Sequence, residues 1–455
     1  MKHIHFIAIG GAIMHQLAIA LKKEGYLVSG SDDEINDPAR SNLAAEGILP
    51  SETGWFPTKI TSSIDAVVLG MHAKAGNPEL QKAKELGIPV YSFPQYVYEV
   101  SKDKQRIVIA GSHGKTTITS MVMHILRSRQ MDFDYLVGAR VEGFSQSVRL
   151  SKAPLMVLEG DEYPASVEEK RPKIFFYHPQ VTVLSGIAWD HINVFPTYEN
   201  YFDQFRQYLT TMGSGTLLIY NEEDPEVVRL VAEAGGHLNL QPYSAPEYHY
   251  RDGTAVLNTP AGQVEVSVFG RHNLMNLQAA VTVATHLNIS QEDAYRAIAG
   301  FTGAAKRLEK VFQSDELVIF RDFAHAPSKL KATLDAVREA YPDSNLIACF
   351  ELHTYSSLSD AFLSQYRDSM NAADQAVVYF STHALELKGL PALQPEVVAG
   401  HFAGNGVVVV NEPEKLLRKV QDLVKASQKP TCLLLMSSGT FDGIDWNSVS
   451  SQEYQ

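Results

Sequence analysis

A glycine-rich loop between an apolar strand and an amphipathic helix is the feature of this 455-residue sequence that most clearly predicts chemistry. The backbone N–H groups of such a loop, with the positive end of the following helix, bind anionic phosphate oxygens. Lys115 is expected to reach the outer phosphates of a nucleotide, and Thr116 to hold Mg²⁺. The loop residues are Gly111, Ser112, His113, Gly114, Lys115, Thr116 and Thr117.

This loop is shorter than the general phosphate-binding loop of nucleotidases. The general pattern has a glycine where this sequence has Ile109. Phosphate binding is still predicted, because an apolar strand precedes the loop and apolar residues behind it recur at the spacing of one helix face. These residues are Ile118, Met121, Val122, Ile125 and Leu126. The broad nucleotidase class is therefore a poor guide to the activity.

Acidic residues and a histidine follow the next apolar runs of the same region. Glu159 ends the run at 155–158, and Asp190-His191 ends the run at 181–189. A carboxylate at the carboxyl end of a strand beside such a loop can bind Mg²⁺, so Glu159 is expected to share the ion with the loop; the alternative is a solvated acidic turn. Because Mg²⁺ prefers oxygen ligands, the residues alone leave His191 equally open to a metal-binding and a structural role.

Near the N-terminus, a Gly-Gly turn is similar to a dinucleotide-binding fingerprint but departs from it. Ala12 and His15 stand where the fingerprint has its second and third glycines, so the pyrophosphate of NAD cannot approach closely. Asp32 follows at about the distance where an acid contacts a ribose. We predict a diphosphate site without a hydride cofactor, in preference to a plain strand-to-helix turn. Its residues are Gly10, Gly11, Ala12, Met14, His15 and Asp32.

Two further groups are candidates for nucleotide contacts. The segment 270–276 begins a helix, where Asn273 is a candidate N-cap and Asn276 lies one position beyond the reach of a cap, available to read an adenine edge. Arg307 lies just after a predicted domain joint, and Asp322 follows a predicted strand. A basic residue at such a joint forms either a salt bridge or a phosphate clamp that works only when the domains close.

The composition excludes several classes of protein. The net charge of −13 disfavours binding to nucleic acid or to an anionic membrane. Cys349 and Cys432 lie in apolar runs and are expected to be buried thiols of a reducing compartment. No apolar run approaches the roughly 20 residues that span a bilayer, and the N-terminus becomes a strand too early for a signal peptide. We expect a cytoplasmic protein, either a monomer or a weak dimer.

Strand-like runs alternate with helical patterns along most of the chain, which predicts an α/β fold with parallel sheets covered by helices. Short antiparallel strands are expected at 243–268. We place domain boundaries at the charged segment 102–106 and around Phe301-Thr302-Gly303. The three predicted domains are a Rossmann-like domain at 1–104, a central P-loop mononucleotide-binding domain at 105–302 and a Rossmann-like C-terminal domain at 303–455.

Together these motifs resemble those of the Mur ligase family, from residue 1 to about residue 445. The short loop, the Glu159 turn, Asp190-His191 and the segments 270–276, 306–307 and 322–327 occur in the order and spacing of that family. The resemblance implies a cytoplasmic, ATP-dependent enzyme that forms an amide bond in peptidoglycan synthesis, with ATP and Mg²⁺ as cofactors. It also implies that the three domains bind the UDP-sugar, the ATP and the incoming amino acid or peptide.

The resemblance assigns roles to individual residues. Lys115 would bind the β- and γ-phosphates, Thr116 and Glu159 would hold one Mg²⁺, and His191 would hold the second. The turn at 10–15 would hold the UDP diphosphate. The residues that would flank the adenine side or reach the nucleotide from the third domain are His272, Asn273, Asn276, Arg307 and Asp322.

Arg206 stands where several relatives carry a carbamylated lysine, about fifteen residues after the metal-binding histidine. We therefore predict no carbamyl-lysine, and we expect Arg206 to face the transferred phosphoryl group or the acyl carboxylate. The catalytic residues that the resemblance implies are Lys115, Glu159, His191, Arg206 and Arg307.

The implied reaction activates the lactyl carboxylate of UDP-N-acetylmuramate as an acyl phosphate, which an amine then attacks. One family activity uses L-alanine as the amine, and another uses the recycled tripeptide L-Ala-γ-D-Glu-meso-diaminopimelate. The tripeptide is favoured for the following reason. Relatives that add L-alanine carry arginines that bind the alanine carboxylate, but the matching segment 351–357 contains no arginine. The first carboxyl of a peptide is an amide, so a peptide does not need them. The segments 161–163, 170–173 and 438–443 favour the same activity.

His325 and His353 are expected on the amine side of the site. Relatives with either activity have a second histidine where this sequence has Ala326. The role of His325 is therefore left open.

Two activities of other classes are also compatible with parts of the pattern. A nucleotide-sugar-sensing P-loop ATPase would turn over ATP without an amine. A dehydrogenase would need NAD in the first domain, which the missing glycines disfavour.

Overall fold

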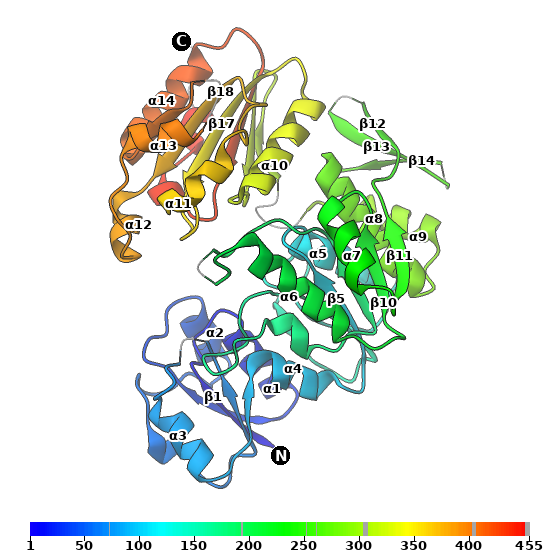
Figure 1. Ribbon diagram of the computed structural model, residues 1–455, viewed down its shortest axis with the longest axis vertical. Coiled ribbons are helices and arrows are strands. Elements are labelled where there is room, and N and C mark those ends of the chain that lie inside the picture. The colour runs from blue at the N-terminus through cyan, green and yellow to red at the C-terminus, as the bar shows by residue number, and fades with distance from the viewer. Residues whose placement is uncertain are drawn as a thin grey trace.

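The computed structural model describes residues 1–71, 73–192, 194–251, 253–260, 262–303, 308–402 and 406–450. The chain forms three α/β units, with the N-terminal unit at one end, the C-terminal unit at the other and the central unit between them (Figure 1). The predicted α/β fold is confirmed, while the domain limits at 104/105 and 302/303 stay predictions. Arg307, a predicted site residue, lies outside the described residues.

The N-terminal unit contains a four-stranded parallel sheet in the order β2-β1-β3-β4. The central strand β3 is buried along its whole length, which is why it is a continuous apolar run. The elements are β1 (His3–Ile7), α1 (Met14–Lys23), β2 (Leu27–Ser31), α2 (Ala39–Ala45), β3 (Ala66–Leu69), α3 (Pro78–Glu85), β4 (Val90–Ser92) and α4 (Phe93–Ser101), with a 3-10 turn at Pro57–Lys59.

The central unit contains a seven-stranded sheet in the order β11-β10-β9-β5-β8-β6-β7, parallel except at β7. Strand β5 lies between β8 and β9, so the segments that follow these three strands meet at one edge of the sheet. The elements are β5 (Gln105–Ala110), α5 (Lys115–Ser128), β6 (Asp134–Leu136), β7 (Val148–Arg149), β8 (Leu155–Glu159), β9 (Val181–Leu184), α6 (Tyr198–Thr210), β10 (Leu217–Asn221), α7 (Pro225–Ala234), β11 (Asn239–Tyr243), α8 (Arg271–His286) and α9 (Gln291–Ile298), with a 3-10 turn at Lys173–Phe176.

A separate three-stranded antiparallel sheet precedes α8 in the chain. It consists of β12 (Tyr248–Arg251), β13 (Thr254–Thr259) and β14 (Gly262–Val266). The antiparallel strands expected at 243–268 are therefore present, within a slightly shorter range.

The C-terminal unit contains a six-stranded sheet in the order β15-β16-β20-β17-β18-β19. It is parallel except at the edge strand β15, which pairs antiparallel with β16. Cys349 and Cys432 are buried free thiols, as expected. The elements are β15 (Glu309–Gln313), β16 (Leu317–Asp322), α10 (Pro327–Ala340), β17 (Asn345–Leu352), α11 (Asp360–Leu363), β18 (Gln375–Phe380), α12 (Thr382–Leu387), α13 (Pro395–His401), β19 (Val408–Val410), α14 (Pro413–Lys425), β20 (Thr431–Met436) and α15 (Asn447–Ser450), with 3-10 turns at Ser364–Tyr366 and Phe441–Gly443.

A buried arginine connects the first unit to the strand that carries the glycine-rich loop. Arg106, on β5, donates hydrogen bonds to the carbonyl oxygens of Ser101 at 2.7 Å and Tyr177 at 2.8 Å. Ser101 ends α4, so the guanidinium satisfies a carbonyl at the negative end of that helix. This contact fixes the start of β5.

Within the described parts of the chain, no helix is both long and apolar enough to cross a bilayer.

Candidate functional site

The glycine-rich loop follows β5 and begins α5, as the sequence predicts. Gly111 and Gly114 have positive φ values of 123° and 78°. An added Cβ on Gly114 would lie 2.3 Å from Oδ1 of Asn276, so no larger residue fits without displacing that side chain. Among the described residues, no side chain caps the first turn of α5, which leaves its N–H groups available to an anion.

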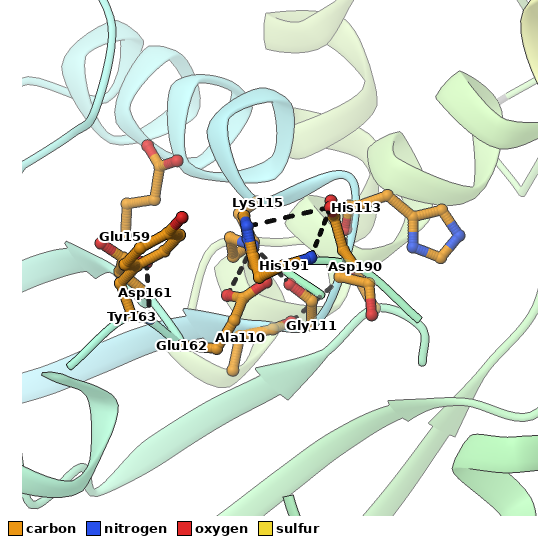
Figure 2. Close-up of polar contacts among 12 residues, drawn as sticks. Ala110, Gly111, His113, Lys115, Glu159, Asp161, Glu162, Tyr163, Asp190 and His191 are labelled. Carbon is orange, nitrogen blue, oxygen red and sulfur yellow. Dashed lines mark hydrogen bonds and ion pairs between the residues drawn. The ribbon is translucent and has the colours of Figure 1, made fainter. Parts of the chain in front are cut away.

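Lys115 binds a buried carboxylate that the sequence analysis did not assign to the site. Its Nζ donates to the Gly111 carbonyl at 2.7 Å and lies 2.8 Å from Oε2 of Glu162. The Glu162 side chain is only 2% exposed. Burial alone would raise the pKa of Glu162, but Lys115 and His191 hold that pKa well below its usual range. In the same way, Glu162 raises the pKa of Lys115 although burial lowers it. Figure 2 shows these groups around the loop.

Thr116 and Glu159 lie together, as the sequence predicts. The Thr116 hydroxyl donates to Oε1 of Glu159 at 2.7 Å, and the N–H of Gly138 donates to Oε2 at 2.7 Å. Two oxygen ligands beside a phosphate-binding loop fit Mg²⁺. No group of three His, Cys, Asp or Glu side chains suited to a metal is found in the described ranges, so such an ion would also need phosphate or water oxygens.

His191 lies at the other side of Glu162. Its Nε2 is 3.6 Å from Oε1 of Glu162, and its ring packs edge-on against Tyr163 at 4.6 Å between centroids. Burial lowers the pKa of His191, but Glu162 and Asp190 outweigh it and raise that pKa. The structure therefore brings His191 to the Lys115 end of the site.

Asp190 connects this group to the C-terminal unit. Its Oδ2 lies 3.4 Å from Nζ of Lys329 and 3.9 Å from Nε2 of His325, both from the segment around the start of α10. Burial raises the pKa of Asp190, but Lys329 and the two histidines lower it overall to about 2. His325 thus faces the central unit.

A cavity of about 900 Å³ opens between the loop, the start of α8 and α10. It is large enough for a nucleotide. Buried Nδ1 of His113, at its edge, has no hydrogen-bond partner among the described residues. Oδ1 of Asp322 accepts from the N–H groups of Leu308 at 3.0 Å and Phe323 at 2.8 Å. The predicted nucleotide-binding residues that line the cavity are His113, Gly114, Thr117, His272, Asn273, Asn276 and Asp322.

Arg206 lies away from Lys115 and Glu162, contrary to expectation. Its guanidinium pairs with Asp203 at 2.6 Å and with Glu233 at 2.9 Å, on the outer side of α6. The buried face of α6 presents Tyr201 instead, whose hydroxyl lies 2.8 Å from Oγ of Ser112 and 3.1 Å from Oε1 of Glu162. The spacing from His191 led to the expectation for Arg206, but this residue lies on the outer face of α6. Successive residues are rotated by about 100° around a helix axis, so spacing along the sequence alone does not fix the face.

His353 lies just after β17, beside a buried carboxylate. Its Nδ1 lies 3.5 Å from Oε1 of buried Glu351, at the end of β17. An added Cβ on Gly439 would lie 2.6 Å from the same Nδ1, so the segment after β20 packs against this histidine. His353 therefore lies on a part of the C-terminal unit distinct from the Asp190 contact.

The predicted diphosphate-binding turn is present after β1. Oδ2 of Asp32 accepts from the N–H of Gly10 at 2.7 Å, and Nδ1 of His15 lies 2.9 Å from the Gly11 carbonyl. Both side chains are buried, and burial lowers the pKa of His15. Asp32 and His15 therefore shape the turn, and the ribose and diphosphate roles of the turn stay predictions. Met14 begins α1 beside it, and Ala12 is exposed.

Comparison with known families identifies three successive matches along the chain. Residues 3–105 match the model described as Mur ligase family, catalytic domain; residues 109–284 match Mur ligase middle domain; residues 306–439 match Mur ligase, glutamate ligase domain. These matches lie in the three α/β units in order.

Individual relatives cover most of the chain. A UDP-N-acetylmuramate–L-alanine ligase from Desulforamulus reducens is 30% identical over 406 residues, 86% of this chain and 85% of that protein. A UDP-N-acetylmuramate–L-alanyl-γ-D-glutamyl-meso-2,6-diaminoheptandioate ligase from Haemophilus influenzae is 27% identical over 461 residues, 98% of both chains. The crystal structure of a murein peptide ligase from Psychrobacter arcticus covers 100% of both chains with a TM-score of 0.64 and 23% identity, which shows a shared fold. The chain therefore belongs to the Mur ligase family and is an ATP-dependent, ADP-forming amide ligase.

Proposed function

We propose that this ligase joins the lactyl carboxylate of UDP-N-acetylmuramate to the amine of L-Ala-γ-D-Glu-meso-diaminopimelate, in cytoplasmic peptidoglycan recycling. The observation that carries the proposal is the end of β17, where Glu351 is 1% exposed and the segment 351–357 contains no arginine. A free α-carboxylate such as that of L-alanine needs a cation beside it, whereas the first carboxyl of a tripeptide is an uncharged amide.

Within the nucleotide site, we assign Lys115 to the outer phosphates and the first turn of α5 to the phosphate oxygens. Thr116 and Glu159 would hold a Mg²⁺ ion, with His191 as the candidate ligand of a second; the ion would neutralise charge on the phosphoryl oxygens. Asn273, Asn276 and Asp322 lie on the cavity wall and are assigned to the nucleoside side.

The chemistry requires a carboxylate to become an acyl donor. A carboxylate oxygen forms a bond to the γ-phosphorus as the bond to ADP breaks, which leaves an acyl phosphate. The neutral amine then adds to the acyl carbon, and the C–O bond to phosphate breaks after the amine loses its proton. We assign Lys115, held by its ion pair with Glu162, to the negative charge that develops during the first step.

An L-alanine ligase is the second candidate, favoured by the D. reducens relative at 30% identity. A nucleotide-sugar sensor without an amine substrate is the candidate from another class. The two ligases differ in the acceptor, and the sensor differs in releasing ADP without any acceptor.

An isotope experiment tests the ligase chemistry itself. UDP-N-acetylmuramate labelled with heavy oxygen in its carboxylate is mixed with ATP, Mg²⁺ and the tripeptide. The proposed route transfers one labelled oxygen to the released phosphate. Unlabelled phosphate, or ADP release at the same rate without the tripeptide, would overturn it. Lys115→Ala should release no ADP, while Lys102→Ala, at an exposed pair with Glu99, should behave as the wild type.

A further inference from the structure

Helix α10 of the C-terminal unit has two lysines with opposite surroundings. Nζ of Lys329 lies 3.4 Å from Oδ2 of Asp190 in the central unit, and its side chain is 19% exposed. Lys331 is 61% exposed and pairs with Asp335 on its own helix at 2.6 Å. Lys329 is therefore directed at the central unit, whereas Lys331 is directed at solvent.

The inward lysine belongs to the same cavity as the glycine-rich loop. Lys329 lines that cavity together with His113 and Gly114. The pKa of His113 falls to about 4, first through desolvation and then through the charges of Lys329 and Lys115. Two lysines from different units thus act electrostatically on one loop residue.

A series of ion pairs also connects Lys329 to the Lys115 end of the glycine-rich loop. Asp190, its acceptor, precedes His191 in the chain, and His191 lies 3.6 Å from Glu162. Glu162 in turn binds the ammonium of Lys115 at 2.8 Å. A chain of contacts through Asp190, His191 and Glu162 therefore joins the ammonium of Lys329 to that of Lys115.

We propose that Lys329 binds the terminal phosphoryl group of ATP from the C-terminal unit, with Asp190 holding its ammonium in position. This inference rests on the proposed assignment of the nucleotide to the cavity. Charge on a transferring phosphoryl group is stabilised by cations fixed around it, in a site from which water is excluded. A cation on α10 is available only when the two units are together, so Lys329 couples ATP binding to that arrangement.

The experiment compares two nucleotides that differ by one phosphoryl group. Dissociation constants of ADP and of a non-hydrolysable ATP analogue are measured calorimetrically for the wild type, K329M, K329R and the control K331M. Loss of a hydrogen bond to a charged group predicts that K329M weakens analogue binding about tenfold relative to ADP binding. K329R should retain most of the preference, and K331M should keep all of it.

The remaining outcomes distinguish a phosphoryl contact of Lys329 from a purely structural role. If K329M weakens both nucleotides by the same factor, or neither, Lys329 is only an ion-pair partner of Asp190 and the inference is wrong. If K329M does not fold, K329Q provides the same comparison. Failure of the wild type to bind either nucleotide would instead overturn the nucleotide assignment as a whole.

Discussion

Lys115 of the glycine-rich loop and Glu162, which follows β8, form a nearly buried ion pair, with Nζ 2.8 Å from Oε2 and side-chain exposures of 16% and 2%. The pair holds the ammonium at the position where phosphate oxygens would bind. Glu162 is thus the counter-ion of Lys115 in the structure, and under the proposed assignment the nucleotide phosphates would bind the same cation.

Glu162→Gln should destabilise the nucleotide-free protein by about 3 kcal/mol, because it leaves Lys115 without its buried partner. A bound ATP analogue should reduce this difference, since its phosphates supply the missing negative charge. The measurement is the urea-unfolding midpoint with and without the analogue. The control is Glu168→Gln, which breaks an exposed pair with Lys84 and should change the stability by less than about 1 kcal/mol. Equal losses in the two variants would contradict this account of the pair.

The pairing of Thr116 with Glu159 could be predicted, whereas that of Lys115 with Glu162 could not. Strands β5 and β8 are parallel neighbours, so a strand-end carboxylate next to the loop follows from their order. The position of Glu162 depends on a turn that begins where the N–H of Gly160 donates to the Ile109 carbonyl at 2.7 Å. That bond joins residues far apart in sequence, and no local pattern encodes it.

The error for Arg206 has a related origin. The sequence identified an amphipathic helix after His191, but the side chain that reaches the loop is set by the rotation of α6 against the sheet. Tyr201 occupies that place, and its hydroxyl contacts Ser112 and Glu162. A buried tyrosine on such a helix is normally a core residue, so its type gave no signal.

Arg206→Ala should keep kcat within about twofold of the wild type, because its pairs with Asp203 and Glu233 are partly exposed and contribute little. ADP release with saturating substrates measures the effect. A fall of a hundredfold or more, with unchanged circular dichroism, would restore the expected role beside the phosphoryl group.

Gly114→Ala should abolish detectable nucleotide binding. The new Cβ would meet Oδ1 of Asn276 at 2.3 Å, and the residue has a φ of 78° that disfavours side chains. Gly25→Ala is the matched control, since Gly25 has a φ of 82° but no atom within 4 Å of the added Cβ. The control should lose roughly 1 kcal/mol of stability and bind the ATP analogue normally. Normal binding by Gly114→Ala would contradict the assignment of the loop.

His113 should make the nucleotide-free protein sensitive to acid. Desolvation, then Lys329 and Lys115, lower its pKa to about 4 from an ordinary value of 6.5. Below pH 6.5 the unfolded chain gains a proton that the folded protein does not, so stability falls as pH decreases towards 4. Between pH 7 and pH 5 the wild type should lose roughly 2 kcal/mol more than His113→Asn. Parallel urea-midpoint curves for the two proteins would contradict the shifted pKa.

The acceptor assay tests the central claim most directly. ATP, Mg²⁺ and UDP-N-acetylmuramate are mixed with either L-alanine or L-Ala-γ-D-Glu-meso-diaminopimelate, and ADP and the new nucleotide product are quantified together. We predict ADP and product in equal amounts with the tripeptide, and neither above background with L-alanine. Turnover with L-alanine alone would contradict the tripeptide assignment in favour of the L-alanine ligase. ADP release without either amine would contradict the ligase proposal.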